Sequence, residues 1–115
     1  GNAEFKKGNF VEAVECYTEA LNLERKLLSA WNNRAMAYLK LGNFAECESD
    51  STAALQLDPV NVKALLRRGT AYAFQNIFDK ALVDFQAVLK LEPNNKAALL
   101  EISRMRAMAA VEQPQ

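Results

Sequence analysis

The sequence predicts an all-α fold: a superhelix of three stacked helical hairpins, the first one truncated, followed by a C-terminal capping helix. Two observations lead to this prediction. Gly8-Asn9-Phe10 returns as Gly42-Asn43-Phe44 and, in a looser form, as Asn76-Ile77-Phe78, which sets a repeat period of 34 residues. Within each period the apolar residues are spaced three or four apart, as on one face of a helix.

The apolar spacing predicts two helices in each full unit. The first unit, residues 1–25, is expected to lack about seven residues of its opening helix, because the repeat period would place them before Gly1. The second unit covers 26–59 and the third covers 60–93. Gly42-Asn43 is expected to form the turn between the two helices of the second unit, because glycine tolerates a positive φ at a helix end. Asp58-Pro59 and Glu92-Pro93 close the second and third units, because the residue before a proline disfavours helical geometry.

The stretch after Pro93 predicts one more amphipathic helix. Leu99, Ile102 and Met105 supply its apolar face, and a terminal helix with a polar outer side caps a repeat array. We expect the capping helix within 94–111 and a frayed tail at 112–115. The domain as a whole is expected to span 1–111 as a monomer, with weak self-association through the apolar end of the truncated unit as an alternative.

The composition excludes several classes of protein. Fourteen basic residues cancel fourteen acidic ones, so no global field attracts nucleic acid or an anionic membrane. No apolar run approaches the roughly 18 residues that span a bilayer, and the start is not a signal peptide, so we expect a cytoplasmic protein. The chain has no histidine, and its serines lack a general base, so we expect no catalytic residue, metal site or cofactor.

The two cysteines, Cys16 and Cys47, lie in predicted helices without a second metal-type ligand nearby. We expect two small thiols packed in the fold rather than a disulfide or a metal site.

The first helix of each hairpin should line the concave face of a superhelix. Residues three or four apart form one stripe on each of these helices. The stripe residues are Ser29, Asn33, Met36 and Lys40 in the second unit, Lys63, Arg67, Thr70 and Phe74 in the third, and Asn2 and Lys6 in the first.

Lys63 and Arg67, at i and i+4, direct two cations into one part of this groove. Asn33 and Asn2 add amide donors from neighbouring helices. A carboxylate is the ligand that such a cluster of donors satisfies, especially a terminal acidic residue with two of them. Beside the donors, Met36 and Phe74 offer an apolar surface for a side chain upstream of the terminus.

The unit pattern resembles the tetratricopeptide repeat, which has a bulky residue, a small one, an aromatic, a Gly turn, then Ala, aromatic, Ala and Pro. The resemblance implies a right-handed superhelix. Matching positions are Trp31, Ala35, Tyr38, Gly42, Phe44, Cys47, Ala54 and Pro59, then Leu65, Gly69, Tyr72, Phe78, Ala81, Phe85 and Pro93. Departures are Ser51 for an aromatic, Cys47 and Val88 for alanine, and Asn76 for the turn glycine.

The donors also resemble the carboxylate clamp of co-chaperone tetratricopeptide domains, which holds the C-terminal Glu-Glu-Val-Asp segment of the Hsp70 and Hsp90 chaperones. Asn2, Asn33, Lys63 and Arg67 are similar to four of its five positions, and Lys40 to an additional basic residue. The fifth, a lysine, would precede Gly1. The resemblance implies a co-chaperone adaptor that binds an Hsp70 or Hsp90 tail.

An alternative prediction is a repeat scaffold that binds an internal helix or strand in the groove without a free carboxylate. Arg34 and Arg68 adjoin the stripe but point off it, so we interpret both as structural or solvent-facing. Trp31 occupies the bulky core position and is expected to pack rather than bind.

Overall fold

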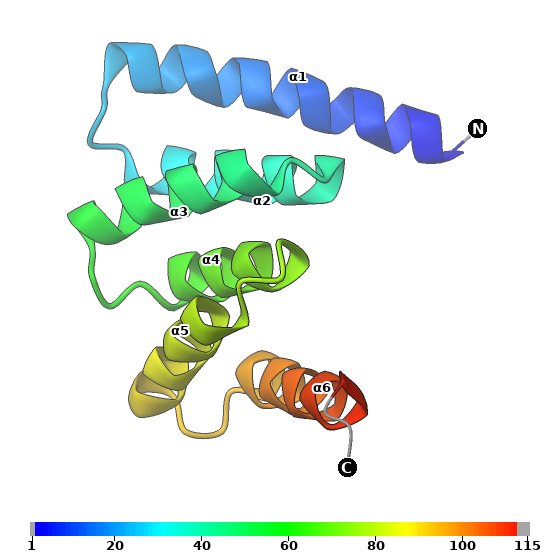
Figure 1. The fold of residues 1–115 in the computed structure, drawn as a ribbon. Helices are drawn as coiled ribbons and strands as arrows, with labels where there is room; N and C mark the ends of the chain where they lie inside the picture. Colours follow the sequence, from blue (N-terminus) through cyan, green and yellow to red (C-terminus); the bar gives the residue numbers. More distant parts are fainter. Residues whose placement is uncertain (1, 113–115) are drawn as a thin grey trace.

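The computed structural model describes the backbone of residues 2–112 and the side chains of residues 8–108. Six helices follow one another: α1 (Asn2–Leu23), α2 (Leu28–Leu41), α3 (Phe44–Leu57), α4 (Val62–Phe74), α5 (Phe78–Leu91) and α6 (Lys96–Glu112). They stack in chain order into a body of 53 × 36 × 21 Å, with the ends of the chain at opposite ends of the stack (Figure 1). The predicted all-α fold is confirmed, and the described residues contain no strand.

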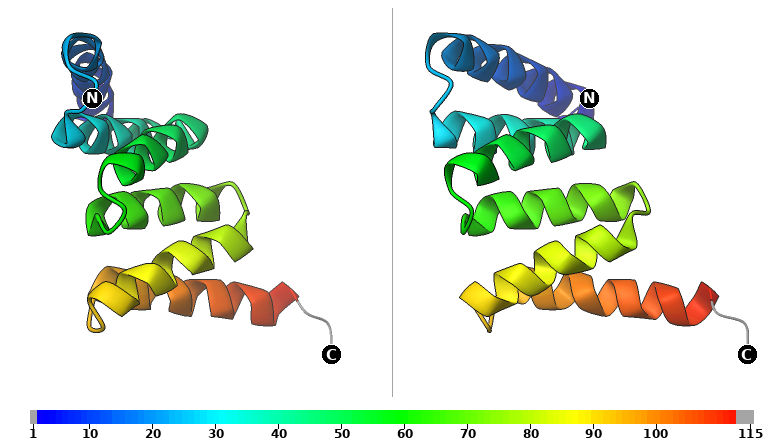
Figure 2. Two further views of the ribbon diagram at one scale, coloured as in Figure 1. Left: turned by 90° about the vertical axis from the view of Figure 1, so that its left-hand side faces the viewer. Right: turned by 60° about the vertical axis from the view of Figure 1, so that its left-hand side comes forward.

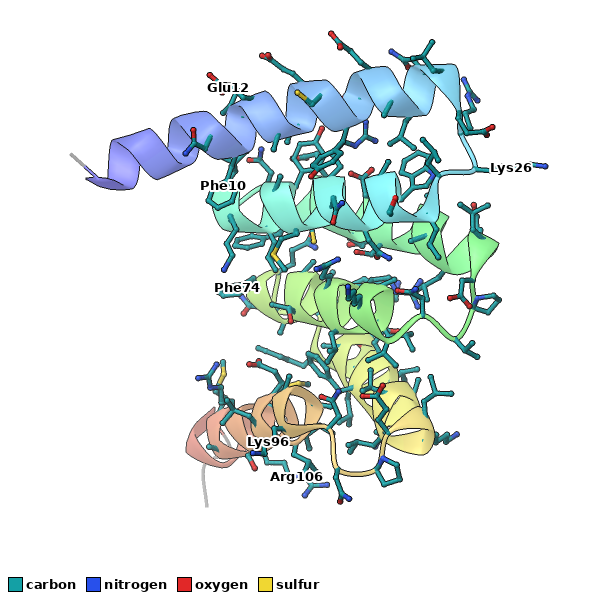
Figure 3. The ribbon with its side chains drawn as sticks, turned by 180° about the vertical axis from the view of Figure 1, so that it is seen from behind. Phe10, Glu12, Lys26, Phe74, Lys96 and Arg106 are labelled. Atoms are coloured by element: carbon teal, nitrogen blue, oxygen red, sulfur yellow. The ribbon has the colours of Figure 1, made fainter. Side chains whose placement is uncertain are left out.

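The first unit differs from the prediction, because α1 runs without a break through Gly8 and Asn9. The repeat period had placed a turn there. Continuing α1 costs only the modest helix penalty of Gly8. Figure 3 shows Phe10 pointing from α1 toward α2 and Glu12 pointing away from the stack.

The two complete hairpins turn in the same way with different residues. Gly42 ends α2 with a φ of 78°, and the N–H of Asn43 bonds back to the Tyr38 carbonyl at 2.9 Å. In the next unit Asn76 takes the positive φ, at 63°, and Ile77 N–H bonds to the Tyr72 carbonyl at 2.9 Å. Asparagine is the residue that best replaces glycine in this left-handed conformation, so the predicted exchange at position 76 preserves the turn.

Asparagine caps begin α4 and α6 in the same way. Asn61 Oδ1 accepts from the Ala64 N–H at 2.9 Å, and Asn95 Oδ1 accepts from the Ala98 N–H at 2.9 Å. Each cap satisfies an N–H that has no partner inside its helix. The two capped helices therefore start at equivalent points of consecutive units.

The core lies between the hairpins and is built from small residues around a few large ones. Phe85 and Val88 are fully buried, and alanines 54, 64, 81 and 98 allow the helices to approach closely. A Cβ built on Gly69 would lie 2.8 Å from Cε1 of the Phe85 ring. Glycine is therefore required on α4 where the ring packs against it.

None of the described helices is both long enough and apolar enough to cross a membrane.

Candidate functional site

The helices α2, α4 and α6 form one side of the stack (Figure 2). Each helix contacts the next one along the chain, and α2 also contacts α4, which in turn contacts α6. The two views of Figure 2 show α2, α4 and α6 following one another along the stack. The predicted stripe residues of the second and third units lie on α2 and α4, two neighbouring helices of this surface.

A hollow of about 650 Å³ opens between the first turns of α2 and α4 and the loop that leads into α4. Its lining is mixed, with polar groups next to aliphatic ones. The lining residues are Leu28, Ser29, Asn32, Asn33, Asp58, Val60, Asn61, Val62, Lys63 and Glu92. Asn33 and Lys63, two predicted carboxylate-binding residues, therefore share one hollow although they come from different helices.

Arg67 lies one turn beyond Lys63 on α4 and is half-buried. Its Nη1 donates to the main-chain carbonyl of Asn32 on α2 at 2.9 Å. Burial lowers the pKa of Arg67, because it removes water from the guanidinium. The ordinary pKa of arginine is so high that the group stays charged. Within residues 8–108, neither Lys63 nor Arg67 forms an ion pair with a carboxylate.

We call Asn33, Lys63 and Arg67 the donor cluster. Asn33 and Lys63 are exposed, and Arg67 directs one of its N–H groups to α2 while keeping further donors. A cluster of this kind binds an anion with several oxygen acceptors, because charge-assisted hydrogen bonds to carboxylates are short and strong.

Two carboxylates that the sequence analysis did not anticipate also line the hollow. Asp58 Oδ2 accepts from Asn61 Nδ2 at 3.2 Å, and Glu92 Oε1 accepts from Asn95 Nδ2 at 2.9 Å. They follow α3 and α5 at equivalent positions of the repeat. An anionic ligand is therefore favoured on the side of the donor cluster and disfavoured on the side of the loops.

The predicted groove-lining residues continue along α2 and α4 away from the hollow. Met36 is half-buried, and Lys40 is exposed in the last turn of α2. Thr70 Oγ1 donates to the Leu66 carbonyl at 2.8 Å, so this hydroxyl serves its own helix. Phe74 is 63 % exposed and stacks on Phe44, with ring centroids 4.6 Å apart.

Phe74 also borders a second, largely apolar hollow of about 300 Å³ between the end of α4 and the second half of α6. Figure 3 shows the Phe74 side chain at the end of α4 that faces away from the loop into that helix. The other lining residues are Ala73, Asn76, Phe78, Glu101, Arg104, Met105 and Met108. The polar and apolar parts of the predicted groove thus lie at opposite ends of α4.

The predicted residues Asn2 and Lys6 lie in the first turns of α1, outside the part of the chain whose side chains are described. The 34-residue period aligns Asn2 with Met36 and Lys6 with Lys40, so neither is level with Asn33. A role for Asn2 and Lys6 stays a prediction.

Arg34 and Arg68, which the sequence analysis interpreted as structural or solvent-facing, make the same three contacts 34 residues apart. Arg34 forms a two-bond ion pair with Asp50 and also donates to Thr18 Oγ1 at 3.1 Å. Arg68 repeats this with Asp84, and its bond to Thr52 is 3.3 Å. Each arginine therefore joins three helices. The recurrence of Arg, Asp and Thr at a 34-residue spacing was the signal available in the sequence.

Trp31 packs against the core and donates from Nε1 to the Arg25 carbonyl at 2.8 Å, as expected of a packing residue. Both cysteines are free: Cys47 is buried as expected, whereas Cys16 is exposed on α1. The described residues contain no group of histidine, cysteine or acidic side chains suited to a metal ion.

Three family models of the tetratricopeptide repeat together match residues 1–59 and 62–95. A model described as TPR repeat matches residues 1–42, and two models described as tetratricopeptide repeat match residues 29–59 and 62–95. Solved structures that are 37–43 % identical match 92–96 % of the chain. The chain belongs to the tetratricopeptide-repeat family, whose domains are protein-interaction modules.

The second TPR domain of human RPAP3, solved in complex with the HSP70 peptide SGPTIEEVD, is 43 % identical. The match covers 92 % of this chain and 88 % of that one, with a TM-score of 0.83. The first TPR of Spaghetti (RPAP3), bound to the HSP90 peptide SRMEEVD, is 37 % identical over 96 % and 87 % of the two chains, with a TM-score of 0.86. The Arabidopsis OM64 TPR domain is 42 % identical over 94 % and 89 %, with a TM-score of 0.84.

Proposed function

We propose that this chain binds the free C-terminus of a partner protein that ends in acidic residues, with its carboxylates on the donor cluster. The observation that carries this proposal is that Asn33 and Lys63, from two neighbouring helices, line one hollow, with Arg67 one turn beyond Lys63 on α4. Neither cation is neutralised by a carboxylate within the described side chains. A terminal acidic residue offers a main-chain and a side-chain carboxylate together, which matches several converging donors.

The comparisons support a particular class of partner. Two of the similar domains were solved with peptides from HSP70 and HSP90, and both peptides end in Glu-Glu-Val-Asp. We propose that the chain is a co-chaperone adaptor that binds the C-terminal tail of Hsp70 or Hsp90 and performs no catalysis itself. We also propose a cytoplasmic location, which the two free cysteines support because oxidising compartments favour disulfides.

The length of α4 suggests how a tail would lie. Lys63 and Phe74 are eleven residues apart, which corresponds to about 16 Å along a helix. An extended peptide covers this distance in about five residues. With its terminal residue on the donor cluster, the peptide would bring an upstream apolar side chain to Phe74 and the second hollow. Met36 and Lys40 would line the intervening groove from α2.

A second candidate is a scaffold that binds a peptide without a free carboxylate. Asp58 and Glu92 favour it, because they place negative charge in the same hollow as Lys63. An internal segment that carries a lysine or arginine would complement those two carboxylates.

The test is a calorimetric titration with a peptide that ends in Met-Glu-Glu-Val-Asp, next to the same peptide with an amidated C-terminus. We expect the free acid to bind with a dissociation constant on the order of micromolar, because a short tail buries a small interface. The amide should bind at least about tenfold more weakly, since it loses one charged acceptor. Equal binding of the two peptides would support the second candidate, and binding of neither would overturn the carboxylate proposal.

A further inference from the structure

Asn32 connects α2 to α4 at two points. The residue is almost completely buried, at 6 % exposure, and its Nδ2 donates to Asn61 Oδ1 at 3.1 Å. Its main-chain carbonyl accepts from Arg67 Nη1 at 2.9 Å. The residue next to Asn33 in the sequence thus contacts both the start of α4 and one of the cations of the donor cluster.

The first of these contacts reaches the residue that begins α4. Asn61 Oδ1 accepts from Ala64 N–H as well as from Asn32, and Asn61 Nδ2 donates to Asp58 Oδ2. All the polar atoms of the Asn61 side chain are therefore engaged, and the orientation of its amide is determined. Lys63 lies two residues after Asn61, so the Asn32–Asn61 hydrogen bond fixes the position of the Lys63 backbone relative to α2.

The next unit provides an internal comparison. Asn95 caps α6 and bonds to Glu92 just as Asn61 caps α4 and bonds to Asp58. The position of Asn32, however, is taken there by Leu66, which packs against the core. The fold accepts leucine at this point of the repeat, and an asparagine cap works without a partner from the preceding unit.

Asn32 is also a costly residue for stability. Its Oδ1 is buried and has no hydrogen-bond partner within residues 8–108. An unpaired buried acceptor destabilises the folded state, and leucine would avoid that penalty. Stability alone does not account for an asparagine here, whereas its side-chain amide contacts the cap of α4, two residues before Lys63 of the donor cluster.

We infer that Asn32 is a positioning residue for the donor cluster: its amide sets the start of α4 against α2 and so sets where Lys63 and Arg67 lie relative to Asn33. This inference rests on the proposed function. Donors that are held at one spacing before the ligand arrives bind more tightly, because less freedom is lost on binding.

The experiment repeats the titration with the free-acid and amidated peptides on Asn32→Leu. Leucine removes the amide and keeps the main-chain carbonyl. We expect a folded protein whose melting temperature is equal to or above that of the wild type. The free acid should bind about five- to tenfold more weakly, which corresponds to the net loss of one hydrogen bond. The preference for the free acid over the amide should shrink.

A second pair of variants keeps the test valid if Asn32→Leu fails to fold. Asn61→Ser keeps a hydroxyl that can cap α4 but is too short to keep the bond to Asn32 as well. Asn95→Ser makes the same change at the cap of α6, which has no counterpart of Asn32. Asn61→Ser should weaken binding of the free acid as Asn32→Leu does, and Asn95→Ser should leave it unchanged.

A double-mutant cycle with Arg67→Ala separates positioning from general stability. If the Asn32 amide positions Arg67 by placing α4 against α2, then Arg67→Ala costs less affinity in the Asn32→Leu background than in the wild type. Equal costs in the two backgrounds, or wild-type affinity in both Asn32→Leu and Asn61→Ser, overturn the inference. Failure of the wild type to prefer the free acid is a different result, because it overturns the proposed function and this inference with it.

Discussion

Arg34 holds both carboxylate oxygens of Asp50, through Nε and Nη2, at 2.8 Å each. Arg68 and Asp84 repeat the pair one unit later. The aspartates are nearly buried, with 4 % of each side chain exposed, and the hydrogen bonds that Asp50 accepts from Arg34 raise the pKa of Arg34. The guanidinium of Arg34 also lies 5.1 Å from the centroid of the Trp31 ring. These pairs therefore join the two helices of each hairpin in a partly desolvated setting.

Asp50→Asn should lower the free energy of unfolding by about 2 kcal/mol, because it leaves a partly buried guanidinium with a neutral partner. Urea denaturation followed by circular dichroism measures this change. Glu101→Gln is the control, since the Arg104–Glu101 pair lies within one helix and leaves 63 % of the arginine side chain exposed. The control should change stability by less than about 0.5 kcal/mol. Equal effects would mean that the buried pairs contribute no more than surface pairs.

Gly8 and Gly42 occupy equivalent repeat positions and should respond to alanine in opposite directions. Gly42 has a positive φ, so Gly42→Ala should destabilise by about 1–2 kcal/mol. Gly8 lies inside α1, and nothing stands within 4 Å of an added Cβ, so Gly8→Ala should stabilise by up to about 1 kcal/mol. Thermal unfolding of the two variants measures both. A loss of stability in Gly8→Ala would show that the turn predicted from the repeat forms after all.

Lys63 and Glu92 should affect peptide binding in opposite directions. Lys63→Ala removes a cation of the donor cluster and should weaken binding of the free-acid peptide at least tenfold. Glu92→Gln keeps the oxygen that accepts from Asn95 but removes a negative charge from the hollow, so binding should strengthen about twofold.

Calorimetry at low salt measures the effects of Lys63→Ala and Glu92→Gln on peptide affinity. Raising the salt concentration should make both effects smaller. Lys80→Ala is the matched control, because Lys80 is an exposed lysine that lines a different hollow on α5. A comparable loss in Lys80→Ala would indicate a non-specific charge effect rather than a clamp.

The two thiols should differ in reactivity and in their effect on stability with pH. Iodoacetamide at neutral pH should label Cys16 in the folded protein and both cysteines in urea, which mass spectrometry distinguishes.

Burial raises the pKa of the Cys47 thiol from its ordinary 9.0 to about 11. As the pH rises, the Cys47 thiol therefore keeps its proton to a higher pH in the folded state than in the unfolded state. The contribution of Cys47 to the free energy of unfolding is fully present below pH 9.0 and is lost as the pH rises to about 11.

Cys47→Ala is the control for the pH series, because alanine occupies the equivalent positions 13 and 81. The variant should lose less stability than the wild type as the pH rises from 9 to 11. Equal losses of stability in the wild type and in Cys47→Ala over this pH range would show that the pKa of Cys47 is the same in the folded and unfolded states.

The sequence predicted the helices and turns better than the contacts between units. The 34-residue period located α2 to α5, the apolar spacing after Pro93 located α6, and Asn76 was correctly identified as the stand-in for a turn glycine. The period failed at Gly8, because a glycine inside a helix costs only a modest penalty, and α1 continues through it. Pairings such as Asn32 with Asn61 depend on the rotation between units, which spacing along one chain does not encode.

The same limit applies to the candidate site. Spacing identified Asn33, Lys63 and Arg67 as donors on two helices, and the structure brings Asn33 and Lys63 into one hollow. The sequence did not predict the negative charge that Asp58 and Glu92 add to the hollow. Both residues directly follow a helix, and the course of the loops places them at the hollow.

The contacts between helices have a consequence for the speed of folding. Within the described part of the chain, every helix packs only against the next one or the next but one, so native contacts join residues that are near in sequence. Chains with such a low contact order fold in about microseconds to milliseconds, because little loop-closure entropy is lost before contacts form. We expect either internal hairpin to start the process, after which the neighbouring helices add in turn.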